Sequence, residues 1–108
     1  MADTINALNI PGTWTDLNTL SGISVGTGII LQNLGSTSGA VQNIGTPNVV
    51  IEITTSSTTP DESFIGWHML INEQFTVDTG DPKVWLKFTK LGGADVGSET
   101  ALVKVQAL

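Results

Sequence analysis

The sequence of 108 residues lacks cysteine, arginine and tyrosine and carries few charges of either sign. Without cysteine, neither a disulfide framework nor a thiolate metal site can form. Four lysines against ten acidic residues give a net charge of −6. This balance disfavours nucleic acid and anionic membranes as partners, because both require clustered basic residues. No apolar run reaches the roughly 18–20 residues of a transmembrane helix, and the N-terminus shows no signal-peptide pattern. We therefore expect a protein made in the host cytoplasm.

The residues that are present favour strands and turns. Thr, Ser, Gly and Asn dominate, and no window shows the sustained apolar spacing of an amphipathic helix. Short apolar runs recur between turn signals, which predicts one all-β domain, an antiparallel β-sandwich or jelly roll of about seven or eight strands. The expected strands are residues 14–20, 29–34, 49–54, 64–71, 74–77, 83–90 and 101–106, with a short segment at 23–25. We expect residues 13–108 to form this domain and residues 1–12 to be an N-terminal segment, an arm that orders on a neighbour.

Four connections are expected between these strands. Residues 35–48 are rich in Gly, Ser, Thr and Asn and read as a loop, in which the QNLG of residues 32–35 recurs as QNIG at 42–45. Two equivalent strand-ending turns explain this repeat, and so does chance. The polar stretch 55–62, closed by Pro60, is expected to cross between the two sheets. Residues 78–82 and 91–95 have the composition of turns.

No residue pattern indicates catalysis. The sequence has one histidine, His68, in a predicted strand, and no serine lies in a nucleophile elbow. Asp78 and Asp81 have only part of a calcium-loop pattern, and a hairpin turn explains them equally well. The Gly-rich stretches precede no helix, as a phosphate-binding loop requires. We therefore predict that the chain is not an enzyme and has no catalytic residues, no cofactor and no metal site.

The three tryptophans are the candidates for an interface. Trp85 shares a strand face with lysines, opposite Val84, Leu86 and Phe88, and a tryptophan on that face indicates contact with a partner unless loops cover it. Trp67 and Trp14 are expected to pack in the core or at a sheet edge.

The order of several short motifs resembles small virion proteins of tailed bacteriophages, a group of capsid decoration, head-fibre and neck or tail accessory proteins. The motifs are the LQNLG turn at 31–35, the apolar run at 49–53, Pro60, Gly66 to Leu70, the strand at 75–77, Val84-Trp85 and the VKV strand at 103–105. The likeness covers about residues 15–106. Residues 36–48 look like an insertion relative to the group, and Lys87 stands where an arginine is expected. The resemblance implies a β-sandwich or jelly-roll subunit of the virion, present in many copies and usually oligomeric.

Three functions follow from these observations. The first is a structural virion protein, a capsid decoration or head-associated subunit, with copies of itself (a homotrimer or another homo-oligomer) and phage capsid or tail proteins as partners. The alternative is a carbohydrate-binding or receptor-binding adhesion module of a tail tip or fibre, indicated by tryptophan on a Thr- and Asn-rich surface. The third, an enzyme or metal-dependent module, would have to use His68 or Asp78 with Asp81.

Overall fold

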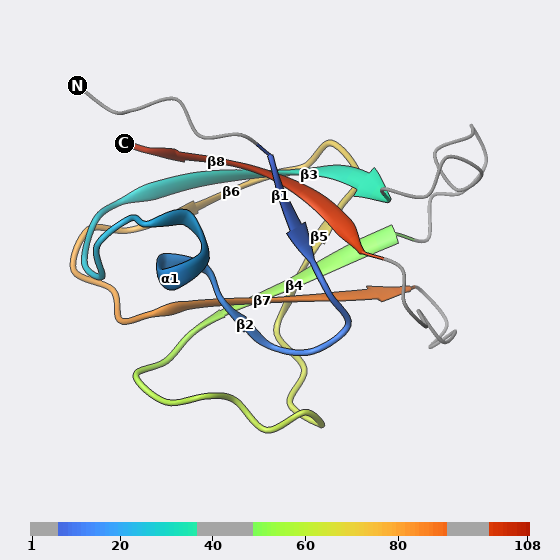
Figure 1. Ribbon diagram of the computed structural model, residues 1–108, viewed down its shortest axis with the longest axis horizontal. Helices are drawn as coiled ribbons and strands as arrows, with labels where there is room; N and C mark the ends of the chain where they lie inside the picture. The colour runs from blue at the N-terminus through green and yellow to red at the C-terminus, as the bar shows by residue number, and fades with distance from the viewer. Residues whose placement is uncertain (1–6, 37–48, 91–99) are drawn as a thin grey trace.

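The structure is a computed structural model that describes residues 7–36, 49–90 and 100–108. These ranges contain eight strands and one short helix (Figure 1). The strands are β1 (Leu8–Ile10), β2 (Thr15–Asp16), β3 (Ile29–Ser36), β4 (Val49–Thr55), β5 (Trp67–Leu70), β6 (Gln74–Val77), β7 (Val84–Lys90) and β8 (Ala101–Ala107), and the helix is α1 (Leu17–Ser21). The all-β class and the approximate number of strands predicted from the sequence are confirmed.

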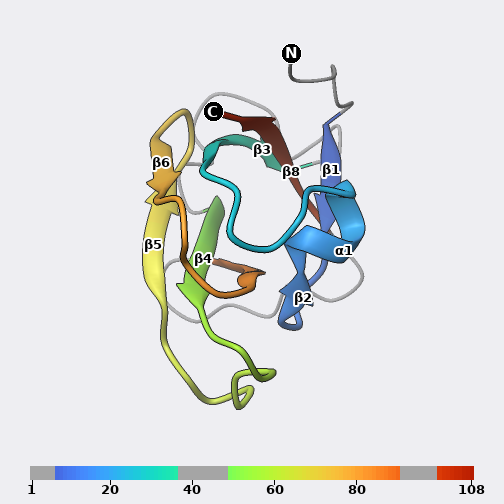
Figure 2. The ribbon, with the colours of Figure 1, turned by 90° about the vertical axis from the view of Figure 1, so that its left-hand side faces the viewer.

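The strands form two four-stranded antiparallel sheets that face each other (Figure 2). Sheet A has the order β1-β8-β3-β6, and sheet B has the order β2-β7-β4-β5. The neighbouring pairs include β1 with β8, β2 with β7, β3 with β6 and β4 with β5. The chain is thus one long hairpin that is folded between β4 and β5 and then rolled into two layers. This is the topology of a jelly roll, one of the two forms of sandwich that the sequence predicts.

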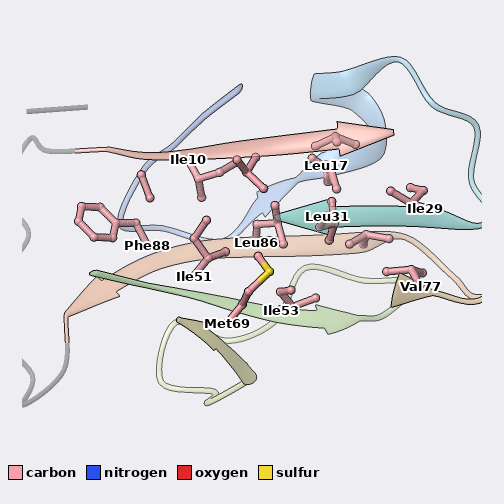
Figure 3. Close-up of a cluster of buried hydrophobic side chains, with 14 of the residues drawn as sticks. Ile10, Leu17, Ile29, Leu31, Ile51, Ile53, Met69, Val77, Leu86 and Phe88 are labelled. Atoms are coloured by element: carbon pink, nitrogen blue, oxygen red, sulfur yellow. The ribbon is translucent and has the colours of Figure 1, made fainter. Parts of the chain in front are cut away.

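The core lies between the sheets and is built from alternate residues of the long strands (Figure 3). On β7, Val84, Leu86 and Phe88 point inward and are at most 1% exposed, as their alternation predicts. The alternation predicted for β8 is also confirmed, with Ala101, Val103 and Val105 in the core. β4 is buried on both faces, because Val50 and Glu52 are covered as well.

The prediction of a strand at 14–20 is wrong, because only Thr15–Asp16 is extended and α1 follows directly. Asp16 caps the helix by accepting a hydrogen bond from the Thr19 N–H at 3.2 Å, and Gly22 ends it with a φ of 79°. Such local bonds offer the backbone an alternative to the sheet. Asn18 then joins the helix to β7 by accepting from the Val84 N–H at 2.8 Å. No helix in the described part of the chain is long and apolar enough to span a bilayer.

The first QNLG segment is a bulge within β3 and does not end the strand. The register with β8 shifts between Asn33 and Gly35, so that Leu34 is the additional residue, and the strand continues to Ser36. Gly35 has a φ of 99°, which glycine adopts without a steric penalty. The rest of the predicted loop, the second copy at 42–45 and the turn predicted at 91–95 lie outside the described residues.

Three further expectations change. The connection at 55–62 does not cross between sheets, since β4 and β5 pair within sheet B, and the chain passes to sheet A only after β5. The strand predicted at 64–71 contracts to Trp67–Leu70. Leu8–Ile10, expected in an arm, pairs with β8 and places Ile10 in the core, whereas residues 1–6 lie outside the described part.

Candidate functional site

The connection between β4 and β5, residues 56–66, folds back over the outer face of sheet B. It is held there by side chains of the sheet: the Trp85 indole donates to the Ser56 carbonyl at 2.9 Å, and Lys87 donates to the Glu62 carbonyl at 2.7 Å. Trp85 is only 7% exposed as a result. The lysine-bearing face of β7 does point outward as predicted, but this connection covers its tryptophan within the same chain.

Trp14 is buried under the same connection, as expected. Its indole donates to the Asp61 carbonyl at 3.1 Å, its ring lies 6.1 Å from that of Phe64, and the Lys87 ammonium lies 5.7 Å from its centre. Gly66 passes so close that an added Cβ would lie 3.0 Å from the Trp14 ring and 2.6 Å from the Ile53 carbonyl. These contacts hold residues 61–66 in one conformation.

Polar contacts within the connection and beneath it support this arrangement. Hydrogen bonds from the backbone and hydroxyl of Ser63 hold the pKa of Asp61 below its ordinary range. The buried Glu52 carboxylate accepts from the Gly66 N–H at 2.9 Å. The segment that leads into β5 is therefore held by hydrogen bonds at both ends.

The exposed apolar side chains gather where this segment enters β5. Phe64 is 47% exposed, Ile65 is 73% exposed and Trp67 is 74% exposed. All three line one hollow together with Thr54 and Gly66, so they form a continuous patch, which we call the Trp67 surface. The exposure of Trp67 corrects the expectation that it packs in the core or at an edge.

The register explains why Trp67 is exposed although it leaves β5 on the core side. It lies opposite Ile53, which is fully buried, so both side chains point toward sheet A. At this side of the sandwich β5 and β6 are the edge strands of their sheets, and Figure 2 shows them next to each other. The described part of sheet A does not extend over Trp67.

A cleft of about 250 Å³ opens beside Trp67, between sheet B on one side and β6 with the turn that follows it on the other. Ile53 and Val77 form its apolar floor, and Trp67 and the half-buried Phe75 stand in its walls. Polar groups complete its lining, namely Thr54, Thr55, Thr76, Asp78 and Asp81. The cleft therefore offers an aromatic face together with hydroxyl and carboxylate groups, which is the chemistry needed to bind a sugar ring.

The remaining candidates from the sequence are the turn at 78–82 and His68. Residues 78–82 form the predicted turn, in which Asp81 accepts from the Asp78 N–H at 3.2 Å and Gly80 has a φ of 94°. Within the described ranges, no three His, Cys, Asp or Glu side chains come together as metal ligands. His68 is exposed on β5, opposite Glu52.

The structure separates the three tryptophans proposed for an interface. Contacts within the chain occupy Trp14 and Trp85, whereas Trp67 is exposed. Phe64 and Ile65 are not expected at a surface from the sequence, because their pattern predicts a strand, in which one of the two side chains would face inward. Pro60-Asp61-Glu62 just before them was the available signal for a longer loop. A scan against models of protein families, a search of curated proteins and a search of solved structures each found no match.

Proposed function

We propose that this chain is a structural virion protein of a tailed phage, a capsid decoration or head-associated subunit that acts by protein–protein contacts through the Trp67 surface. The observation that supports the proposal is the continuous exposure of Phe64, Ile65 and Trp67 on a segment that the fold holds rigid. Contiguous exposed apolar side chains mark interaction sites, since a monomer in water gains nothing by displaying them. Burying Ile65 in a contact would contribute about 2 kcal/mol.

The choice of a virion rests on the resemblance described above. The jelly roll is compatible with it, because viral capsid and lectin domains both use this architecture. The fold by itself does not decide between the two, and the site must do so.

Cosedimentation with purified capsids of the phage that encodes the chain tests this proposal. We expect the chain to pellet with the capsids in many copies, and Ile65→Ser to weaken its binding at least about tenfold. Leu20→Ser is the matched control, since Leu20 is 43% exposed on α1, which follows β2 at the opposite edge of sheet B from β5. A chain that stays in the supernatant at saturating capsid would overturn the proposal.

The cleft beside Trp67 favours one alternative, a module that binds carbohydrate. An indole face beside Thr76, Asp78 and Asp81 could stack on a sugar ring and bind its hydroxyl groups. This alternative predicts a change in tryptophan fluorescence with a glycan, lost in Asp81→Ala. A glycan array without a hit would remove it.

A further inference from the structure

Among the residues that the structure describes, one pair of backbone groups on the outer edge of β5 has no partner. The Leu70 N–H donates to the Glu73 carboxylate at 2.7 Å, and the Leu70 carbonyl accepts from the Glu73 N–H at 3.0 Å, so both Leu70 groups point away from β4. Backbone groups that point to the same side recur at every second residue of a strand. The N–H and carbonyl of His68 therefore also point away from β4, toward the open edge.

The pairing of β4 with β7 leads independently to the same direction for the His68 backbone groups. Phe88 on β7 donates its N–H to the Pro11 carbonyl at 2.9 Å, away from β4. Ile51 lies opposite Phe88 in β4 and opposite Met69 in β5. In antiparallel pairing Ile51 must then direct its own backbone groups to Met69, which leaves those of His68 on the free side.

The Glu73 carboxylate closes one end of the β5 edge at Leu70, but the strand itself carries no residue of the kinds that usually prevent pairing with other chains. Its four residues include no lysine, proline or acidic side chain. The other edges are less available: β2 has only two residues, β1 has three and is followed by Pro11, and β6 is flanked by Glu73 and Asp78.

We infer that β5 pairs antiparallel with β5 of a second copy about a two-fold axis at His68, which joins the two B sheets into one sheet of eight strands. This inference rests on the proposed function as a structural subunit. It assigns Trp67 of that surface to the second copy and leaves the exposed Phe64 and Ile65 for the capsid. The register follows from the Leu70–Glu73 bonds. Only with His68 opposite His68 do two free N–H groups meet two free carbonyls, because Glu73 already satisfies those of Leu70.

In this register the side chains of one copy fit those of the second copy. Trp67 comes to lie opposite Met69 of the second copy, on the core side of the sheet, where it loses its exposure. The hydrogen-bonded pairing ends beside His68, because Glu73 occupies the outward backbone groups of Leu70. A chain with a net charge of −6 repels its own copies in general, and this strand lets them meet through a segment without formal charge.

A single cysteine tests the register, because the chain has none of its own. Opposed residues of a hydrogen-bonded antiparallel pair have Cα atoms about 5.5 Å apart, within the range of a disulfide. We expect His68→Cys to form a disulfide-linked dimer under mild oxidation. Gln74→Cys, exposed on the other edge strand β6, is the control and should cross-link at least about tenfold more slowly. Equal rates for the two variants would overturn the inference.

Proline substitution tests the hydrogen bonds. His68→Pro removes an N–H that β4 does not use, so the fold should persist while dimerisation weakens at least about tenfold. Thr76→Pro is the control on β6, where the Asn33 N–H bond to the Glu73 carbonyl indicates that the Thr76 N–H also faces outward. An unchanged dimer in His68→Pro contradicts the inference. Capsid cosedimentation of the wild-type chain is scored separately, so either proposal can fail without the other.

Discussion

The indole nitrogen of Trp85 donates a 2.9 Å hydrogen bond to the backbone carbonyl of Ser56, 29 residues earlier in the chain. This bond joins β7 to the connection that covers the outer face of sheet B. A residue whose sequence position indicates an outward surface is thereby made part of a second, smaller packing layer of the same chain.

Trp85→Ala should therefore destabilise the fold without affecting association. We expect a loss of about 3–5 kcal/mol in the free energy of unfolding, measured by urea denaturation, because a buried ring and its hydrogen bond are removed together. Trp85→Phe, which keeps most of the ring, should lose about 1–2 kcal/mol. Wild-type stability in Trp85→Ala, combined with a weaker dimer, would place Trp85 in the interface after all.

Asn33 is a buried polar link between the two sheets. From β3 its amide donates to the Met69 carbonyl of β5 at 2.9 Å, and its side-chain oxygen accepts from the Gly35 N–H at 2.8 Å. Asn33→Ala should cost about 2–4 kcal/mol in unfolding free energy, because it leaves buried backbone groups without their hydrogen-bond partner. Its neighbour Gln32 is half-buried and donates to the Asn72 carbonyl at 3.2 Å near the surface, so Gln32→Ala should cost less than about 1 kcal/mol. Equal losses for the two variants would show that the link between the sheets is not important.

Asp16 should make the stability depend on pH in the acid range. Burial acts to raise its pKa, but hydrogen bonds from Thr19 and the Lys83 ammonium at 3.3 Å outweigh burial and lower the pKa below the ordinary value of 3.8. The unfolded chain then binds the proton more readily, so this stabilisation is complete above pH 3.8 and is lost as the pH falls through the lower folded value.

Asp16→Ala measures that contribution. At pH 7 it should lose about 1 kcal/mol in unfolding free energy, the usual effect of removing a helix cap. The difference from wild type should shrink in urea titrations below pH 3.8, where the wild-type carboxylate also becomes neutral. A difference that stays constant down to pH 2 would contradict the assigned contacts.

Trp67→Ala should have the opposite profile to Trp85→Ala. Because Trp67 is 74% exposed, its removal should change the unfolding free energy of the dilute, monomeric chain by less than about 0.5 kcal/mol. The same variant should weaken self-association at least about tenfold in sedimentation equilibrium. A large loss of stability in the dilute chain would mean that Trp67 supports its own fold.

The strands that could be predicted from sequence were those in which burial and side-chain periodicity agree. β7 and β8 alternate apolar and polar residues, and β6 was predicted at its observed bounds, 74–77. The prediction of a strand at 14–20 failed because Asp16 caps α1 through a local hydrogen bond, which the spacing of apolar residues does not reveal.

The candidate site was less accessible from the sequence, because it depends on which faces the chain covers with its own loops. Trp67 and Trp85 both lie in strands, and nothing local distinguishes them. The difference arises because residues 56–66 fold over β7 and leave β5 at an open edge. That arrangement is a property of the jelly roll as a whole, in which β4 and β5 are the two strands on either side of the long hairpin's turn.

Light scattering of the purified chain across a concentration series tests self-association through β5 directly. We expect a species of twice the chain mass of 11.3 kDa that dissociates on dilution, and a monomer for His68→Pro at the same concentrations. A wild-type chain that stays at 11.3 kDa at every concentration would contradict self-association through β5.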